Sequence, residues 1–305
     1  MKPPPEQPHR PQMAEEPRPL PAPARRTARA VQSDSDPDAI ALQRLLQAIF
    51  EQCGLDFRDY AYSSIKRRVM RCVAEERCGT IANLQARALA DTNVMERMLR
   101  TLTVPVTAMF RDPGFFLALR EHAIPILRTY PFLRFWVAGC ATGEEVYSLA
   151  ILLHEEGLTE RCRIYATDLS ETALDQAKTG IFPLSAMQDY THNYQDAGGR
   201  HAFSEYYTAD NQFAAFRPYL RENVVFAAHN LAGDASFNEF NMIFCRNVMI
   251  YFNRSLQDRV HRLLYESLVM FGYLGLGRSE SVRFSACERS YEAVAAKERL
   301  YRKIQ

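Results

Sequence analysis

The 305-residue sequence lacks several features that mark specialised classes of protein. Its formal net charge is only +1, so no excess of one sign favours a polyanion, and we expect no nucleic-acid partner. Its apolar runs are shorter than the roughly 20 residues of a membrane-spanning helix. No positively charged start leads into an apolar signal core. We therefore expect a cytoplasmic protein that is not embedded in a membrane.

The cysteines form no CxxC pair, although the chain contains seven of them. Their scattering argues against a disulfide framework and against a zinc site, and indicates reduced thiols; we expect no metal. The remaining composition, with 47% apolar and 24% charged residues, is ordinary for a globular protein. The length allows one large domain or two modest ones.

Proline is concentrated at the N-terminus, where residues 1–37 hold 10 of the 16 prolines. Proline removes backbone donors, and this stretch has little apolar surface to offset the entropy of ordering. The composition predicts a disordered tail over residues 1–37. A polyproline docking motif is the alternative.

Residues 38–104 are expected to form an N-terminal helical domain. The segment AIALQRLLQAIFEQCG ends at a glycine, as helices commonly do. In YSSIKRRVMRCVAEERCG, a helical wheel places Ile65 and Val69 on one face and Arg67, Arg68 and Arg71 opposite. This basic face is either an ordinary solvated surface or a patch that docks an acidic partner.

From about residue 132 the pattern alternates between strands and helices. FLRFWVAGC, CRIYATDLS and FNMIFCRNVMIYF are typical of buried parallel strands, and EEVYSLAILLHEEG, SETALDQAKTG and SLQDRVHRLLYESLVMFG of helices. Ser170 is an N-cap candidate and Gly180 a C′ candidate. The alternation predicts a doubly wound α/β sheet. Residues 181–225 fit it poorly and are expected to form an inserted excursion of small strands and turns.

A loop of small residues, 139–143, follows the first predicted strand, where ligands bind in such sheets. Glu144 and Glu145 then occupy the start of a helix and would repel a pyrophosphate; they favour a cationic or hydroxyl-bearing ligand. Alternatively, they only complement the helix dipole. Asp168 closes the second strand and is typical of a ribose acceptor, or else of an N-cap. Loop and acid together suggest an adenosine-bearing ligand without a clamped pyrophosphate, a description that S-adenosylmethionine meets.

Several motifs in order resemble one family: VTAMFRD, VAGCATGEEVYSLA, YATDLSETALDQAKTGIF, HNL and IFCRNVMIYF. The resemblance is to the CheR family of chemotaxis receptor methyltransferases, which act in signal transduction. It implies a protein-glutamate O-methyltransferase that methylates chemoreceptors with S-adenosylmethionine, giving glutamate methyl esters and S-adenosylhomocysteine. It also implies a Rossmann-like methyltransferase domain over residues 105–305 with an inserted antiparallel β-subdomain at 181–225. We expect a monomer.

The resemblance also assigns roles to residues. It implies a cofactor site made of eight residues: Thr107, Arg111, Glu145, Asp168, Asn230, Leu231, Arg246 and Asn247. Arg111 would pair with the cofactor carboxylate or lie beside the reacting centre, and Asp168 would hold the ribose. Tyr251 would face the substrate, with Arg111 and Arg246 nearby. These three are the expected catalytic residues.

Two departures from the family bear on these expectations. Pro105 replaces a polar residue, commonly Asn, two positions before the threonine of the T-x-x-F-R motif, which puts one cofactor contact in doubt. The insert is short and lacks a Gly-rich hairpin, so we expect an enzyme that needs no receptor tether and docks the receptor helical bundle on the basic helix 64–75. The alternatives are a methyltransferase with another acceptor and a non-enzymatic module that binds the cofactor.

Overall fold

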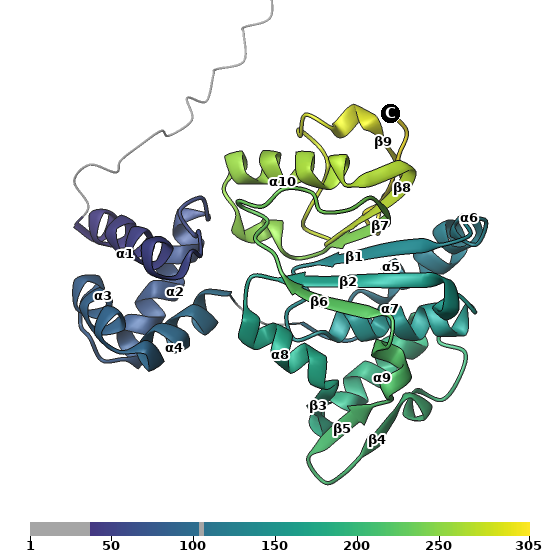
Figure 1. Ribbon diagram of the computed structural model, residues 1–305, viewed down its shortest axis with the longest axis horizontal. Helices are drawn as coiled ribbons and strands as arrows, with labels where there is room; N and C mark the ends of the chain where they lie inside the picture. Colours follow the sequence, from purple (N-terminus) through teal and green to yellow (C-terminus); the bar gives the residue numbers. More distant parts are fainter. Residues whose placement is uncertain (1–36, 104–106) are drawn as a thin grey trace, which may run out of the picture. The chain divides into compact units, whose positions relative to one another are not determined.

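The computed structural model describes residues 37–103 and 107–305. Most of the expected Pro-rich tail and Pro105 lie outside these described residues. The first described part is helical, and the second is built on a seven-stranded sheet (Figure 1). The sheet strands are β1 (Leu133–Ala138), β2 (Cys162–Asp168), β6 (Val224–Ala228), β7 (Phe240–Cys245), β8 (Leu268–Leu276), β9 (Tyr291–Ala295) and β10 (Leu300–Lys303).

Four helices precede the sheet and share one core of aliphatic and aromatic side chains. They are α1 (Pro37–Cys53), α2 (Tyr62–Glu75), α3 (Ile81–Ala90) and α4 (Thr92–Thr103). As predicted, α1 ends at a glycine, since Gly54 follows it with a φ of +72°. In α2, Ile65, Val69 and Cys72 are buried at helical spacing, which confirms the predicted apolar face.

The sheet has the strand order β6-β2-β1-β7-β8-β10-β9. Strands β6, β2, β1, β7 and β8 run parallel, whereas β10 pairs antiparallel with β8 and with β9. The chain moves from β1 to β2 on one side, and β7 lies on the other side of β1. This reversal creates the crevice at the carboxyl ends of the strands where ligands bind in such folds.

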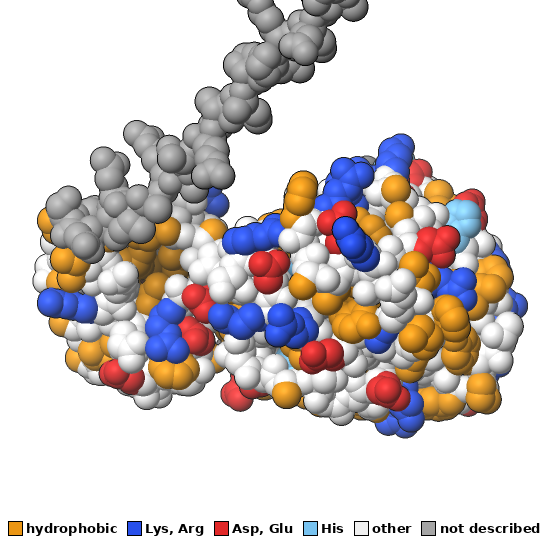
Figure 2. Space-filling view, turned by 90° about the horizontal axis from the view of Figure 1, so that it is seen from above, with side chains coloured by type: hydrophobic (Ala, Val, Ile, Leu, Met, Phe, Trp, Pro, Cys, Tyr) orange, Lys and Arg blue, Asp and Glu red, His pale blue; other side chains and the backbone are white. Residues whose placement is uncertain are grey.

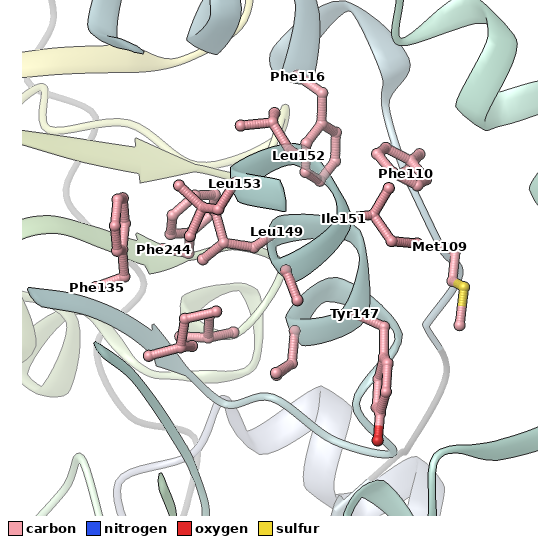
Figure 3. Close-up of a cluster of buried hydrophobic side chains, with 14 of the residues drawn as sticks. Met109, Phe110, Phe116, Phe135, Tyr147, Leu149, Ile151, Leu152, Leu153 and Phe244 are labelled. Carbon is pink, nitrogen blue, oxygen red and sulfur yellow. The ribbon is translucent and has the colours of Figure 1, made fainter. Parts of the chain in front are cut away.

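Helices cover both faces of the sheet, so the side chains along β1 alternate between two cores. Phe135 and Val137 pack in the core that includes α5 (Pro113–Ala118), α6 (Ile124–Leu127) and α7 (Glu144–Glu155), whereas Trp136 packs with α10 (Arg254–Glu266) on the other face (Figure 1). Figure 3 shows leucines of α7 lying beside Phe135 and Phe244 of the sheet. Burial of each such side chain stabilises the fold by about 1.5–3 kcal/mol.

The helix α8 (Glu171–Thr179) begins and ends as predicted. The Ser170 hydroxyl accepts a hydrogen bond from the Ala173 N–H at 3.2 Å, and Gly180 follows with a φ of +66°. After it comes a small antiparallel sheet of β3 (Ile181–Pro183), β5 (Phe213–Phe216) and β4 (Tyr207–Ala209). The expected small strands are therefore present within the excursion.

Three expectations about secondary structure were wrong. The excursion also contains a helix, α9 (Met187–Asp196), which buries Met187, Tyr190 and Tyr194. The helix expected over SLQDRVHRLLYESLVMFG stops at Glu266, because the apolar run after it pairs with β7 and β10 as strand β8. Likewise FNMIFCRNVMIYF is a strand only as far as Cys245, and residues 249–251 form a short 3-10 turn, η6 (Met249–Tyr251).

Candidate functional site

A cleft lies at the carboxyl ends of four parallel strands, with about 950 Å³ of empty space when the open solvent at its mouth is included. The segments that follow β1, β2, β6 and β7 all line it, and residues of α2 and its preceding loop complete it. All eight expected cofactor residues border this cleft, and so does Tyr251. The structure thus brings together residues that are up to 144 positions apart in the chain, from Thr107 to Tyr251.

The loop after β1 and the acid after β2 form one hydrogen-bonded unit. The N–H groups of Gly139 and Cys140 donate to the Thr167 carbonyl at 2.8 and 2.9 Å. The Ala141 N–H donates to Asp168 Oδ2 at 2.8 Å, and the Ser170 N–H donates to Asp168 Oδ1 at 2.9 Å. Burial raises the pKa of Asp168, although these backbone donors oppose the shift. Asp168 is therefore placed by the loop and still presents acceptor lone pairs to the cleft.

Gly139 is required where the loop passes the segment after β7. Its φ is +73°, and a Cβ atom would lie 2.5 Å from Val248 Cγ2. Any side chain would displace Val248, which lines the same cleft. The absence of a side chain at this position therefore lets the loop pack directly against Val248 at the edge of the cleft.

The two glutamates at the start of α7 lie in different surroundings. Glu144 is buried and accepts a hydrogen bond from the Thr142 hydroxyl at 2.7 Å; burial raises its pKa. Glu145 lines the cleft and is paired with Arg246. Only the second glutamate can therefore contribute to a ligand site, and its charge is already opposed by an arginine.

Arg246 holds together three segments of the site. Its Nη1 donates to Glu145, and its Nη2 donates to the Arg111 carbonyl at 2.9 Å and to Asp112 Oδ2 at 2.8 Å. The guanidinium carbon lies 4.3 Å from the centroid of the Phe115 ring, and the side chain is only 2% exposed. These contacts orient the turn that carries Arg111, whose flanking residues Phe110 and Asp112 have positive φ angles of 50° and 57°.

The loop after β6 is shaped by its own side chains. The Asn230 side-chain oxygen accepts from the Ala232 N–H at 2.9 Å, and the Asn230 N–H donates to Asp234 Oδ2 at 2.7 Å. Leu231 is half-buried against the core that includes α10. His229 also lines the cleft and packs edge-on against Trp136 at a centroid distance of 5.3 Å. His229 was not among the expected site residues, although it belongs to the HNL motif together with Asn230 and Leu231.

The loop after β7 carries Asn247 and Tyr251 into the cleft. Asn247 has a φ of +61°, and its N–H donates to Glu280 Oε2 at 2.8 Å. The Tyr251 carbonyl accepts from the Ala61 N–H at 2.9 Å, which joins this loop to the start of α2. The Tyr251 ring lies under the Arg68 guanidinium, whose carbon is 4.2 Å from the ring centroid.

The helical residues of the cleft were not predicted as site residues, and one expectation about them was wrong. Arg68 was placed on the basic face of α2, opposite its apolar face, but it is 6% exposed, lines the cleft and donates to the Leu102 carbonyl at 2.6 Å. Its spacing gave a signal, since position 68 lies three residues after Ile65 and four before Cys72, at the border of the apolar face. Tyr60 and Thr103 also line the cleft. Arg67 and Arg71 are exposed.

The described residues contain no group of three or more His, Cys, Asp or Glu side chains arranged to hold a metal ion. All seven cysteines, each of which lies in the described part of the chain, are free. Burial raises the pKa of the Cys140 thiol well above its usual value, so this cleft residue is an un-ionised thiol at neutral pH. Among the helices of residues 37–103 and 107–305, none combines the length and the apolar character that crossing a bilayer requires.

Comparison with known proteins gave two family matches that together run along most of the chain. The model described as "CheR methyltransferase, SAM binding domain" matches residues 105–298, and "CheR methyltransferase, all-alpha domain" matches residues 40–103. Cher3 of Pseudomonas putida is 48% identical over 264 residues, covering 87% of this chain and 97% of Cher3. The "Chemotaxis protein methyltransferase" of Listeria innocua is 30% identical over 75% of this chain and 85% of its own, and that of Escherichia coli is 29% identical over 82% and 86%.

Proposed function

The chain belongs to the CheR methyltransferase family, and from this membership we propose that it methylates glutamate side chains of chemoreceptors. Its cofactor is S-adenosylmethionine, and it has the fold of a methyltransferase. The proposed products are a glutamate methyl ester and S-adenosylhomocysteine, formed in adaptation signalling. The acceptor, the docking surface and the roles of individual residues are parts of this proposal.

One observation carries the proposal: the same cleft holds groups suited to the cofactor and groups suited to an anionic acceptor. Asp168 and the small residues of the loop 139–143 offer a carboxylate and a backbone that borders the cleft, which fit a ribose and a close-lying ligand. Arg68, Arg111 and Tyr251 offer two cations and a phenol to a carboxylate. Asn230 and Leu231 lie after β6 and border the cleft, where they would flank the adenine.

The chemistry asks little of the protein beyond placement. When bound, S-adenosylmethionine supplies a methyl group activated by its sulfonium. The acceptor glutamate is ionised at pH 7, so no side chain has to remove a proton from it. What remains for the chain is to hold the acceptor in line and to shed water from its carboxylate. We assign the closest acceptor contact to the Tyr251 hydroxyl, because a strong ion pair with an arginine would blunt the nucleophile.

The residues of the cleft fit the cofactor, with one adjustment to the expected roles. Arg246 is expected near the reacting centre, yet its guanidinium contacts Glu145, Asp112 and the Arg111 carbonyl. We therefore propose that Arg246 positions Glu145 and Arg111, and that Arg111 contacts the cofactor carboxylate or the acceptor. Asp168 would accept from the ribose hydroxyls while retaining its backbone donors.

A receptor protein fits the surface better than a nucleic acid does. In the face shown in Figure 2, Lys and Arg side chains are interspersed with Asp and Glu, and no broad patch of one sign appears. A nucleic-acid groove would combine basic and aromatic side chains along a track. For docking of the receptor helices we propose the exposed arginines of α2, Arg67 and Arg71.

The test of the proposed function is transfer of labelled methyl from S-adenosylmethionine to purified receptor cytoplasmic fragments. Label released as methanol by mild base, and absent from fragments whose acceptor glutamates are replaced by alanine, is the expected result. Base-stable label would point to another acceptor. Cofactor binding without any transfer would point to a non-enzymatic module, and either result would refute the proposal.

Docking on α2 is tested with Arg67→Glu combined with Arg71→Glu. We expect about tenfold or greater loss of receptor methylation, because rim charges of an interface govern encounter with a partner of opposite charge. Cofactor affinity should not change. The matched control is Arg44→Glu combined with Arg100→Glu, which makes the same charge change at exposed positions of α1 and α4. Equal losses in both pairs would show that net charge alone matters and that α2 is not the docking face.

A further inference from the structure

A buried carboxylate behind the cleft, Glu280, has no role in the function described so far. It lies in the turn after β8 and is 5% exposed. Its Oε2 accepts from the Gly277 N–H at 2.7 Å and from the Asn247 N–H at 2.8 Å, and its Oε1 accepts from the Ile250 N–H at 3.3 Å. Glu280 thus bridges the end of one strand to the loop that follows another.

Within residues 37–103 and 107–305, the hydrogen-bond donors to Glu280 are backbone amides, and no arginine or lysine side chain donates to it. Burial raises its pKa, and the amide donors act against that shift. A buried carboxylate is costly unless its lone pairs are satisfied. An apolar side chain could fill the same space but could not accept these hydrogen bonds. The role of Glu280 therefore depends on the loop that its hydrogen bonds hold.

That loop is the one that places Asn247 and Tyr251 in the cleft. Asn247 has a positive φ of 61°, an uncommon conformation for a residue with a side chain. Its N–H is one of the two amides bound to Oε2, and Ile250, bound to Oε1, directly precedes Tyr251. The packing is close, since a Cβ at Gly277 would lie 2.7 Å from both Asn247 N and Glu280 Oε2.

We propose that Glu280 is a positioning residue for methyl transfer: its two oxygens separately fix the cofactor end of this loop at Asn247 and the acceptor end at Ile250 and Tyr251. The inference rests on the proposed function for the identity of the acceptor. Glu280 itself does not border the cofactor cleft, so it acts through the loop.

Two substitutions distinguish the contact at the cofactor end of the loop from the contact at its acceptor end. In Glu280→Gln, we expect the amide oxygen to take the place of Oε2, because it then keeps two of the three hydrogen bonds, those from Asn247 and Gly277. The amide NH₂ group then faces the Ile250 N–H, and that hydrogen bond is lost. In Glu280→Ala, all three contacts are lost. The first change therefore disturbs only the acceptor end, and the second disturbs both ends.

The experiment measures kcat and KM of methyl transfer, S-adenosylhomocysteine affinity by calorimetry, and hydrogen exchange of the peptide covering residues 246–252. For Glu280→Gln we expect kcat to fall about tenfold with cofactor affinity within about threefold, and faster exchange in that peptide alone. For Glu280→Ala we expect cofactor affinity to fall as well, by about tenfold or more. Glu288→Gln is the matched control, because Glu288 accepts from the Phe284 N–H at 2.7 Å but is exposed and away from the cleft.

Unchanged kcat per folded molecule in Glu280→Gln, with only a lower free energy of unfolding, would overturn the positioning role. If the wild-type protein transfers no methyl to receptors, the proposed function fails, and the positioning role is then decided by exchange and affinity. Unaltered exchange of residues 246–252 in Glu280→Ala, with unaltered cofactor affinity, would overturn it in that case too.

Discussion

The cleft has two sides that are built differently. On the sheet side, charged groups are held by short hydrogen bonds: Asp168 by the amides of Ala141 and Ser170, and Arg246 by Glu145 and Asp112. On the helical side, Tyr60 packs edge-on against Phe57 and Phe252, each at a centroid distance of 5.1 Å. Arg68 on that side lies over the Tyr251 ring and donates a hydrogen bond to the neutral Leu102 carbonyl.

The difference teaches that cofactor binding and acceptor turnover should be separable by substitution. Hydrogen-bonded charges are strongly directional, and losing one leaves its partner unsatisfied. Ring and cation–π contacts are less directional and contribute about 0.5–2 kcal/mol each. Changes on the sheet side should therefore be severe and affect the cofactor, whereas changes on the helical side should be mild and affect the acceptor.

The largest effect is expected for Arg246→Met. The substitution leaves Glu145 without its arginine partner and leaves Asp112 with only the exposed Arg278, and breaking a buried ion pair by removing one partner costs about 3–5 kcal/mol. Urea unfolding measures this loss. Arg278→Met is the matched control, since Arg278 also pairs with Asp112, at 3.2 Å, but is 58% exposed. We expect the control to cost less than about 1 kcal/mol; equal costs would mean that the sheet side is not held by Arg246.

The next effect in size is expected for Asp168→Asn. One oxygen becomes an NH₂ group that faces the N–H of Ala141 or Ser170, and the ribose loses a charged acceptor. A hydrogen bond to a charged group is worth about 1.5–3 kcal/mol, so S-adenosylhomocysteine affinity should fall about 10- to 150-fold by calorimetry. Asp175→Asn, on an exposed position of α8, should change nothing. Cofactor affinity retained in Asp168→Asn would place the ribose elsewhere.

A smaller effect, with a definite sign, is expected from pH. The raised pKa of Asp168 means that it becomes protonated at a higher pH than an exposed aspartate does. The ionised form is the better acceptor, so cofactor affinity should fall as the pH falls through the raised pKa, by at most about tenfold per pH unit. The free energy of unfolding changes in the opposite direction. Burial favours protonated Asp168 in the folded state, and this contribution to stability is complete below the pKa of the unfolded chain. It is lost as the pH rises through the raised pKa of the folded state. Calorimetry from pH 7 downwards measures the fall in cofactor affinity. If the ratio of wild-type to Asp168→Asn affinity does not change with pH, this prediction is wrong.

The same contrast between the two sides explains what could be predicted from the sequence. The elements of the sheet side carry local signals: the run LRFWVA for β1, the small-residue loop, and the caps Ser170 and Gly180 of α8. The first part of strand β8, residues 268–272, was taken as the end of a helix, because LVMFGYLGL is apolar on both faces and only its pairing with β7 and β10 decides between helix and strand. The helix α9 was missed although Met187, Tyr190 and Tyr194 have helical spacing, because its composition is polar.

The site residues divide in a similar way. Asp168 and the loop 139–143 were identified from their positions after strands, whereas the eight-residue cofactor set came from a family resemblance. Arg68, Tyr60 and Glu280 were not identified, because each acquires its role through contacts with a segment distant in the chain. For Arg68, the 183 positions to Tyr251 carry no local signal that one side chain lies over the other.

The smallest expected effect belongs to the boundary between the two sides, at Tyr251. Tyr251→Phe removes the hydroxyl proposed to contact the acceptor but keeps the ring under Arg68, so packing should be maintained. Loss of one hydrogen bond of about 1 kcal/mol should lower kcat about fivefold and leave S-adenosylhomocysteine affinity within about twofold. Tyr62→Phe on the exposed face of α2 is the control and should match the wild type. Equal losses of turnover and of cofactor affinity would mean that Tyr251 belongs with the cofactor contacts, and that the two sides of the cleft do not divide the work between cofactor and acceptor.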